Sequence, residues 1–342
     1  MFLRNWWYCA AESGEVGRSP LGCIFLDEPV VLYRRVDGTP VALEDQCCHR
    51  RAPLRLGALE GDHIRCGYHG FLYDSTGACI WVPGQSSVPP EARVRAYPVC
   101  ERHGWVWIWM GEASRADEAR VPDFFQNEHP EWASVCGVLR FKANHMLLVD
   151  NLLDLSHLAF LHASSIGSQG DTNPDLTWER GEDWVRGTRV SRNVAASQRM
   201  RDEGVTAGVD QTKIMTFTPP ANVLIEITTT ETGLAPGETG RLHQYSVIID
   251  AITPETETSC HYFWANARNY DIEDADHSAA YLRVSEAAFA EDMGMLEGQQ
   301  HNIERDPDKA MVDVNGDSGG LQARRLVERL LLEDSQARAA AE

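Results

Sequence analysis

The sequence predicts an α+β protein with an N-terminal all-β domain and a C-terminal antiparallel sheet flanked by helices. Three observations lead to this fold class. The chain has 342 residues, which is enough for two domains. Its first hundred residues contain short apolar runs separated by turn residues, and similar strand-like runs recur between residues 175 and 270. Its last sixty residues carry apolar side chains at helical spacing.

The N-terminal strands are predicted from local composition. The apolar runs are GCIFL and PVVLYRR, followed by the turn DGTP and the run VALED. Trp105, Trp107 and Trp109 alternate with Val106 and Ile108, so the three indoles share one face of a strand. We expect this face to be a packed or inter-domain surface rather than a ligand site.

A polar segment, GEASRADEARVPDFF, separates the two predicted domains, which are residues 1–115 and 116–342. Helix-forming residues predict a helix over 146–162, ended by the Gly and Ser residues that follow it. Two further helices are expected over 278–302 and 319–333.

Composition excludes several classes of function. The chain has 31 Lys and Arg residues against 51 Asp and Glu, a net charge of −20, and no basic run, which argues against nucleic-acid binding. No apolar stretch approaches the ~20 residues of a membrane span, and no signal peptide is recognisable. We therefore expect a cytoplasmic protein whose nine cysteines stay reduced and available to bind metal.

The first candidate site consists of Cys47, His49, Cys66 and His69. Each of two short segments, CCHR and CGYHG, supplies one thiolate and one imidazole, with sixteen residues between the two pairs. Tetrahedral zinc accepts two Cys and two His, and so does a Rieske [2Fe–2S] cluster, which places two Cys on one iron and two His on the other. Zinc fingers usually pair Cys with Cys and His with His. The mixed pairs here favour the Rieske cluster, whose role is one-electron transfer. The spacing favours Cys47 over its neighbour Cys48 as the ligand.

The second candidate site lies in the predicted helix. His157 and His162 occur within a strongly apolar stretch, and two imidazoles with one carboxylate form the facial triad of mononuclear non-haem Fe(II). Asp154, one helical turn before His157, is a candidate for the carboxylate, but it is better suited to orient that imidazole. Asp292, on a later helix, is the more distant candidate, and the adjacent Glu291 competes with it.

Together these motifs resemble the oxygenase components of Rieske non-haem iron oxygenases, and the resemblance covers nearly the whole chain. It extends to the segments DNLLDLSHLAFLHASSIG, FTPPANVLIEI, AITPETETSCHYFWANARNY and FAEDMGMLEGQQ. These segments are most similar to the demethylating branch, above all the vanillate O-demethylase oxygenase subunit, with dicamba O-demethylase and toluenesulfonate methyl-monooxygenase as neighbours. Cys48 departs from the pattern, since relatives usually have Pro there.

The resemblance implies roles for individual residues. It makes Cys47, His49, Cys66 and His69 the cluster ligands, within an N-terminal Rieske domain. It makes His157, His162 and Asp292 the iron ligands, within a helix-grip-like domain. It assigns Asp154 a catalytic role as the bridge between His69 of one subunit and His157 of the next, in a head-to-tail homotrimer.

The resemblance also implies a reaction. O₂ and electrons from NAD(P)H, passed on by a separate flavin and iron–sulfur reductase or a ferredoxin, are used to O-demethylate a methoxylated aromatic compound, giving a phenol and formaldehyde. The alternatives are hydroxylation of a methyl group of another aromatic, of the toluenesulfonate or dicamba type, and a Rieske electron-transfer protein without catalysis. A separate reductase is required because the chain contains no Gly-rich nucleotide-binding motif.

Two carboxylates are candidates for substrate contacts. Glu226 lies in the strand-like run NVLIEITTT, and Asp250 ends the run YSVIID. A carboxylate in an apolar pocket can accept a hydrogen bond from a phenolic hydroxyl. Equally, each of the two residues fits an exposed or purely structural position.

Overall fold

The structure is a computed structural model that describes residues 1–163, 166, 175–196, 200–201, 205–206, 208–234 and 242–339. The chain divides into two compact units. The first comprises Met1–Asp123 together with Thr253–Glu257, and the second comprises Phe124–Ile252 and Thr258–Glu342. None of the described helices is long and apolar enough to cross a membrane.

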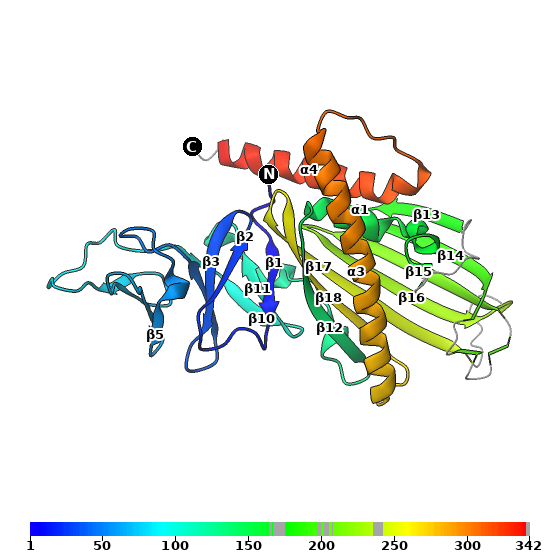
Figure 1. Ribbon diagram of the computed structural model, residues 1–342, viewed down its shortest axis with the longest axis horizontal. Coiled ribbons are helices and arrows are strands. Elements are labelled where there is room, and N and C mark those ends of the chain that lie inside the picture. Colours follow the sequence, from blue (N-terminus) through cyan, green and yellow to red (C-terminus); the bar gives the residue numbers. More distant parts are fainter. Residues whose placement is uncertain are drawn as a thin grey trace. The chain divides into compact units, whose positions relative to one another are not determined.

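The first unit is all-β, as the sequence predicts. It contains three antiparallel sheets with the strand orders β1-β11-β10, β2-β3-β4-β9 and β5-β6-β7-β8 (Figure 1). The strands are β1 Trp7–Glu12, β2 Leu21–Phe25, β3 Glu28–Arg34, β4 Pro40–Glu44, β5 Ala58–Glu60, β6 His63–Arg65, β7 Leu72–Tyr73, β8 Cys79–Trp81, β9 Ala96–Tyr97, β10 Val99–Arg102 and β11 Trp105–Trp109.

The tryptophans of β11 are buried, in agreement with a packed surface. Trp105, Trp107 and Trp109 are each at most 1% exposed. The indole of Trp109 meets that of Trp7 edge to face, with 5.5 Å between the ring centroids. The indole N–H of Trp109 donates to the carbonyl of Glu112 over 2.9 Å, so the polar end of this large side chain is satisfied.

A short segment distant in sequence completes this unit. The hydroxyl of Thr253 donates to the carbonyl of Cys9 over 2.6 Å, and the amide of Leu26 donates to the carbonyl of Pro254 over 2.9 Å. The linear division expected at residues 115 and 116 does not include this segment. A division into contiguous stretches cannot assign the end of a strand to one unit and the rest of that strand to the other.

The second unit is built on one antiparallel sheet with the strand order β12-β18-β17-β16-β15-β14-β13. Its strands are β12 Ala133–Phe141, β13 Asp175–Arg180, β14 Val185–Val194, β15 Val209–Thr218, β16 Asn222–Glu231, β17 His243–Thr256 and β18 Ser259–Arg268. The α-helices that the structure describes from end to end are α1 His145–Leu153, α3 Ala275–Arg305 and α4 Ser318–Ala339. The two C-terminal helices predicted from apolar spacing are therefore confirmed, each with longer ends.

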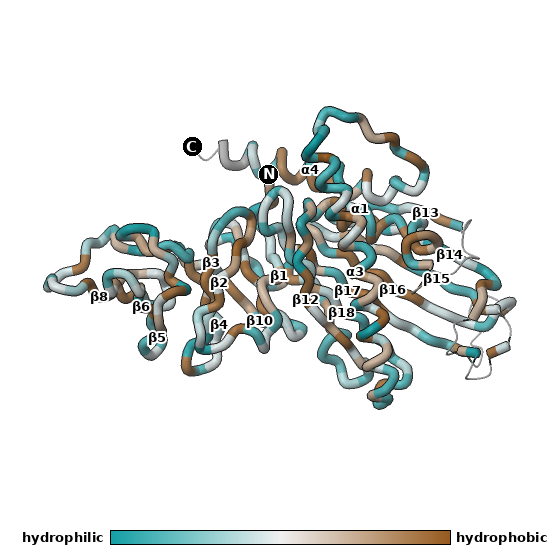
Figure 2. Tube along the Cα trace, viewed as in Figure 1, coloured by the Kyte–Doolittle hydropathy of each residue, from teal (hydrophilic) through white to brown (hydrophobic). Residues whose placement is uncertain are grey.

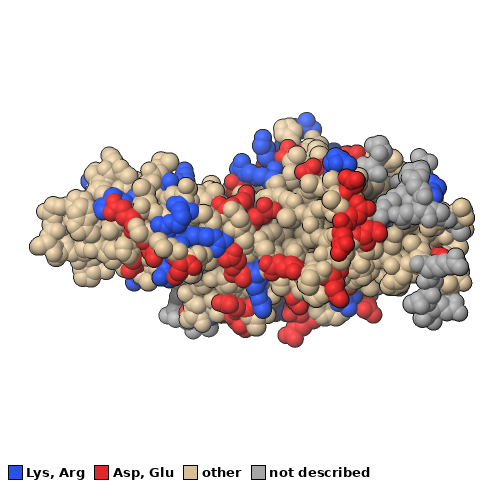
Figure 3. Space-filling view, turned by 90° about the horizontal axis from the view of Figure 1, so that it is seen from below, with Lys and Arg blue, Asp and Glu red and all other residues tan. Residues whose placement is uncertain are grey.

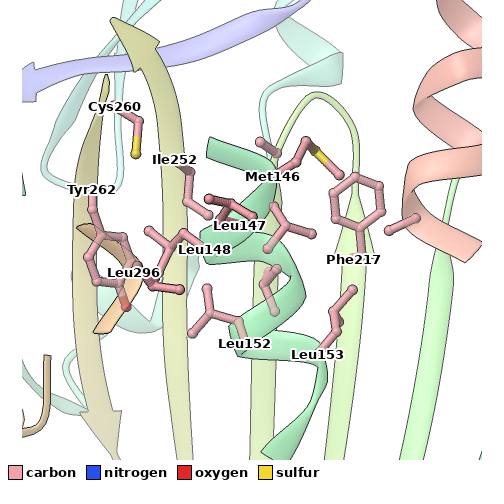
Figure 4. Close-up of a cluster of buried hydrophobic side chains, with 14 of the residues drawn as sticks. Met146, Leu147, Leu148, Leu152, Leu153, Phe217, Ile252, Cys260, Tyr262 and Leu296 are labelled. Carbon is pink, nitrogen blue, oxygen red and sulfur yellow. The ribbon is translucent and has the colours of Figure 1, made fainter. Parts of the chain in front are cut away.

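One face of this sheet, the inner face, packs against α1 and α3. Figure 4 shows Leu147, Leu148 and Leu152 of α1 lying among the side chains of Phe217, Ile252, Tyr262 and Leu296. In Figure 2 the hydrophobic residues concentrate along the strands and α1, whereas much of α3 is hydrophilic. A buried core on one face, covered by amphipathic helices, is the α+β architecture that the sequence predicts.

The charged side chains lie mainly on the surface. On the face shown in Figure 3, Lys and Arg form short clusters flanked by Asp and Glu rather than an extended basic track.

The helix predicted over 146–162 is interrupted, which corrects the prediction. α1 ends at Leu153, and a 3₁₀ helix, η5, covers Leu155–Ala159. Asp154 between them has an extended backbone (φ −112°, ψ 93°), and its carboxylate accepts a hydrogen bond from the amide of Ser156. An Asp side chain that hydrogen-bonds two residues ahead competes with helix continuation, so composition alone overstates the length of this helix.

Candidate metal centres

The four residues of the CCHR and CGYHG motifs lie on two loops with the same backbone pattern. In each loop the amide of the cysteine donates to the carbonyl five residues ahead, from Cys47 to Ala52 over 2.9 Å and from Cys66 to Phe71 over 2.8 Å. In each loop the fourth residue after the cysteine donates back to the cysteine carbonyl. That residue, Arg51 or Gly70, has a positive φ, of 55° or 78°. Two equivalent loops therefore present one thiol and one imidazole each.

The loops bring like ligands together. The rings of His49 and His69 lie 4.7 Å apart, measured between centroids, and both residues are exposed. Cys47 and Cys66 are 2% and 1% exposed, and they lie close enough together for Cys47 to raise the pKa of Cys66. Burial raises the pKa of Cys66, and hydrogen bonds from the amides of Tyr68 and His69 act in the opposite direction. A buried thiol pair beside an exposed imidazole pair fits a cluster that is held by sulfur inside and approached by electrons through imidazole.

Tyr73 belongs to this site, although the sequence gives no signal for it. Its hydroxyl lies 3.1 Å from the sulfur of Cys47 and 3.1 Å from that of Cys48, and it accepts a hydrogen bond from the Cys48 amide over 3.2 Å. Cys48 itself is exposed. A buried phenol next to a ligand sulfur is positioned to tune the charge on that sulfur.

The second site is assembled from η5, the turn that follows it, and α3. One ligand atom each from His157, His162 and Asp292 lies within 4.8 Å of the others. The Nε2 atom of His162 is 3.2 Å from Oδ1 of Asp292, and the Nε2 atom of His157 is 3.7 Å from the same oxygen. Two imidazoles and a carboxylate at this spacing fit a single ion with open positions.

The other nitrogen of each imidazole is already occupied. The Nδ1 atom of His157 lies 2.6 Å from the backbone carbonyl of Asp154, and that of His162 lies 2.6 Å from Oε2 of Glu291. A carbonyl only accepts hydrogen bonds, so Nδ1 of His157 carries the proton and Nε2 keeps its lone pair. Burial lowers the pKa of His157, which favours the neutral, metal-binding form.

The structure places the remaining candidates near the triad in specific roles. Asp154 approaches His157 through its backbone carbonyl, whereas its carboxylate binds the amide and hydroxyl of Ser156. Glu291 contacts His162 on the side away from the triad. Asn151, not expected from the sequence, donates to Oδ1 of Asp292 over 3.0 Å. In the sequence, the only indication of this role of Asn151 is its position one residue after Asp150 in an otherwise apolar helix.

The two candidate substrate residues lie on opposite faces of the C-terminal sheet. Asp250 is fully buried, and its Oδ1 accepts a hydrogen bond from Tyr262 over 2.6 Å. Glu226 lies on the outer face, opposite to Ile225 and Ile227, and accepts a hydrogen bond from Tyr245. Of the two alternatives stated for Glu226, its place on the outer face therefore favours the structural one over a substrate contact. Strand alternation separates it from the core, and composition alone does not tell which face is inside.

Comparison with known proteins agrees with this division of sites. Residues 6–98 match the family model described as Rieske [2Fe-2S] domain, and residues 141–333 match the vanillate O-demethylase oxygenase C-terminal domain. A putative toluene-4-sulfonate monooxygenase system iron-sulfur subunit from Comamonas testosteroni is 39% identical, with 97% of each chain covered. A vanillate O-demethylase oxygenase subunit from Pseudomonas sp. is 37% identical, covering 100% of this chain and 98% of the relative.

Solved structures extend the similarity to the fold. Dicamba monooxygenase bound to dicamba superposes with a TM-score of 0.88 at 30% identity, covering 98% of this chain and 99% of the relative. Another structure of dicamba monooxygenase holds a non-haem iron. The chain uses a Rieske [2Fe–2S] cluster and a mononuclear iron, and takes its electrons from a separate component. Motifs, fold and donor geometry agree that the chain belongs to the Rieske non-haem iron oxygenases, as an oxygenase component of monooxygenase type with a vanillate O-demethylase C-terminal domain.

Proposed function

We propose that the protein is the terminal oxygenase of a multicomponent system that O-demethylates a methoxylated, vanillate-like aromatic compound. Relatives named vanillate O-demethylase and dicamba O-demethylase, at 37% and 33% identity over nearly the whole chain, support this substrate class. The observation that carries the proposal is the triad His157, His162 and Asp292, whose donor atoms lie within 4.8 Å of one another beside an apolar core.

We assign the ligands residue by residue. Cys47, His49, Cys66 and His69 would hold the cluster, and the triad would hold the iron. When bound, the cluster supplies electrons and the iron supplies the redox chemistry that activates O₂. The protein keeps both imidazoles of the triad in the tautomer that leaves Nε2 available, through the Asp154 carbonyl and Glu291. The core that includes Leu155 and Leu158 keeps water away from the reacting methyl group.

The reaction is balanced as follows. An aryl methyl ether, O₂, two electrons and two protons give a hydroxymethyl aryl ether and water. One C–H bond of the methyl group is replaced by C–OH. The product is a hemiacetal, which loses its hydroxyl proton and breaks the bond between the methyl carbon and the aryl oxygen. That oxygen takes up a proton, and the products are a phenol and formaldehyde.

Methyl hydroxylation is the second candidate reaction. The relative named for toluene-4-sulfonate, at 39% identity, favours it, because the same oxidation of an aryl methyl group gives a stable benzyl alcohol. Both reactions use the same triad. A pure electron-transfer role is disfavoured, because such a protein has no need for two oriented imidazoles and a carboxylate around a common point.

Asp250 is our candidate for recognition of a substrate hydroxyl. Burial raises its pKa to about 7, the hydrogen bond from Tyr262 opposes this rise, and the charge of Asp292 adds to it. Within the described part of the chain, Oδ2 of Asp250 has no hydrogen-bond partner. A buried carboxyl oxygen without a partner is destabilising, so a phenolic hydroxyl placed there is favoured.

We also propose a head-to-tail homotrimer of cytoplasmic protein. In it the exposed His69 of one subunit faces Asp154 of the next, and electrons cross at that contact. Asp154 supports this role because its carbonyl already holds His157, which leaves its carboxylate, bound only to Ser156 in the contacts described, beside the imidazole. A heterologous interface of this kind closes into a ring.

The test is a screen for formaldehyde release. The oxygenase, a flavin and iron–sulfur reductase and NADH are incubated with methoxybenzoates, methoxyphenols and methylated aryl sulfonates. O-demethylation gives one formaldehyde per methoxy group lost, whereas methyl hydroxylation gives benzyl alcohols without formaldehyde. Protein from an iron-replete preparation should be red-brown. Coloured protein that oxidises none of the three substrate classes would refute the proposed reaction, and colourless, iron-free protein would refute the cluster.

A further inference from the structure

The phenol oxygen of Tyr73 makes three polar contacts with the loop that carries Cys47. It lies 3.1 Å from Sγ of Cys47, 3.1 Å from Sγ of Cys48 and 3.2 Å from the backbone nitrogen of Cys48. A phenol has one hydrogen to donate and two lone pairs with which to accept. The three contacts therefore use its full hydrogen-bonding capacity, so the direction of each one constrains the other two.

The chemistry of the partners sets these directions. A backbone amide only donates, so the phenol oxygen accepts from the amide of Cys48. A cysteine that holds a cluster does so as a thiolate, which has no hydrogen and is the stronger acceptor of the two sulfurs. The phenol therefore gives its single hydrogen to Sγ of Cys47. The remaining lone pair of the phenol faces Cys48, whose S–H group is then the donor.

The phenol is held in place by the sheet rather than by this loop. Tyr73 is 0% exposed and belongs to the core that contains Cys47. Its backbone pairs with Ile64 across β6 and β7. The thiol of Cys79, opposite Tyr73 on β8, donates to the carbonyl of Trp81 over 3.4 Å, so its hydrogen is engaged elsewhere. Removing a donor from the loop thus changes the hydrogen bonds of the phenol while the sheet keeps the ring where it is.

Cys48 differs from Cys47 in its surroundings. It is exposed, whereas Cys47 is 2% exposed. Proline, the usual residue at this position in the family that the chain resembles, has neither an amide hydrogen nor a thiol. Both donors to the phenol are therefore missing wherever proline occupies this position.

Hydrogen bonds in a chain polarise one another. An oxygen that accepts hydrogen bonds becomes a stronger donor through its own O–H group, so the two donors of Cys48 strengthen the bond from Tyr73 to the Cys47 thiolate. A cluster gains negative charge when it takes up an electron. A stronger hydrogen bond to its sulfur therefore stabilises the reduced form more than the oxidised form and raises the reduction potential.

We propose that Cys48 raises the reduction potential of the Rieske cluster by donating its amide and thiol hydrogens to the phenol of Tyr73, which in turn donates to Cys47. Cys48 is a positioning residue in this scheme, because it acts through Tyr73. The inference goes beyond the proposed function, since it concerns the potential of the cluster rather than the reaction at the iron. It rests on the assignment of Cys47, and not Cys48, as the ligand.

A series at position 48 tests the inference, with the midpoint potential of the loaded full chain measured by redox titration of its visible absorbance. Cys48→Ala keeps the amide and loses the thiol, so the ratio of reduced to oxidised cluster should fall about two- to fivefold, or about 20–40 mV. Cys48→Pro loses both donors and should lower the potential further. Cys48→Ser supplies an O–H donor and should stay within about 10 mV of the wild type. Any other order of the three potentials would overturn the inference.

Tyr73→Phe distinguishes this hydrogen-bond chain from a local change in solvation. Without the phenol, Cys48 has no route to Sγ of Cys47, so adding Cys48→Ala to Tyr73→Phe should change the potential by less than about 10 mV. An effect of equal size in both backgrounds would mean that Cys48 acts through the exposure of the loop, and would overturn the inference. The matched control is Cys136→Ala, which replaces another exposed cysteine on β12 and should leave the potential unchanged.

Two further measurements separate this inference from the assignments on which it depends. Loss of the visible spectrum in Cys48→Ala, with retention in Cys47→Ala, would make Cys48 the ligand and overturn the inference. The potential is measured without substrate, so the expected shifts in a protein that releases no formaldehyde would support the inference and refute O-demethylation. Formaldehyde release together with additive effects of Cys48→Ala and Tyr73→Phe on the potential would support O-demethylation and refute the inference.

Discussion

At the scale of single residues, the ability of a side chain to bind metal depends on which of its atoms already makes a hydrogen bond. The two triad imidazoles use Nδ1 for an oxygen acceptor and turn Nε2 toward Asp292. This arrangement fixes the tautomer before any metal arrives, so the ligand set is preorganised. The same logic makes the carbonyl of Asp154, rather than its carboxylate, the group that orients His157.

Replacing His157 should impair the mononuclear iron site and leave the cluster site intact. His157→Ala removes one of three ligands, so we expect turnover to be abolished and mononuclear iron to be lost, while the visible spectrum of the cluster is retained. Iron content, absorption spectra and formaldehyde release measure the three quantities. The exposed His301 on α3 provides the control, since His301→Ala should change none of them. Loss of the cluster spectrum in His157→Ala would mean that the two sites are misassigned.

Asp250 predicts a pH dependence of stability. Its pKa of about 7 in the folded protein exceeds the ordinary aspartate value of 3.8, so the folded state holds this proton more tightly than the unfolded state. The stabilisation is complete below the unfolded pKa and is lost as the pH rises through the folded pKa. Because an asparagine side chain does not titrate, Asp250→Asn does not lose stability in this way as the pH rises.

We therefore expect the Tm of Asp250→Asn relative to the wild type to rise from about pH 4.5 to about pH 7, by about 2–4 °C per pH unit, and then to level off. Differential scanning calorimetry at matched ionic strength measures it. A Tm difference that does not depend on pH would contradict the proton uptake assigned to Asp250.

At the scale of elements, interruptions of regular structure place the ligands. The break at Asp154 converts the end of a helix into a 3₁₀ turn and a loop, which bring two histidines five residues apart to one point. Asp150, at the end of α1, pairs with Arg324 of α4 over 2.5 Å, which holds this end of the helix in place. In the first unit, the repeated loop pattern does the same for the cluster ligands.

Gly70 tests the importance of that loop. Its φ is 78°, and an added Cβ would lie 3.0 Å from Cγ of Pro83. Gly70→Ala should cost about 1–2 kcal/mol from the left-handed backbone and lower the cluster content. Gly84→Ala is the matched control, since Gly84 has φ 77° and nothing within 4 Å of the added Cβ. We expect both variants to melt earlier, but only Gly70→Ala to lose visible absorbance. Equal absorbance per chain in the two variants would argue against a role of the loop in ligand placement.

At the scale of the whole molecule, the proposed trimer predicts the consequence of replacing Asp154. Asp154→Asn should keep both metals and the trimeric mass, while slowing electron transfer from the cluster to the iron. Single-turnover stopped-flow absorbance follows cluster oxidation, and analytical ultracentrifugation gives the mass. The exposed Asp276, replaced in Asp276→Asn, should behave as the wild type. Unchanged single-turnover rates in Asp154→Asn would count against the bridge.

The classes of both sites and most of the helices and strands follow from the amino-acid sequence. Mixed Cys and His pairs with fixed spacing define the cluster motif, because ligand identity is a local property of the chain. Strand alternation and helical spacing predicted the sheets and α3 and α4, because those patterns record burial on one face. Asp292 was nominated by resemblance, since its position on α3 otherwise fits a solvated carboxylate.

Contacts between groups far apart in the chain are visible only in the folded structure. It brought Asp292 within 3.2 Å of His162 over 130 residues of sequence, and placed Tyr73 against Cys47. It assigned Asp250 to the core and Glu226 to the outer face. Register and the choice of the inner face depend on packing between segments far apart in the chain, and no local pattern carries that information.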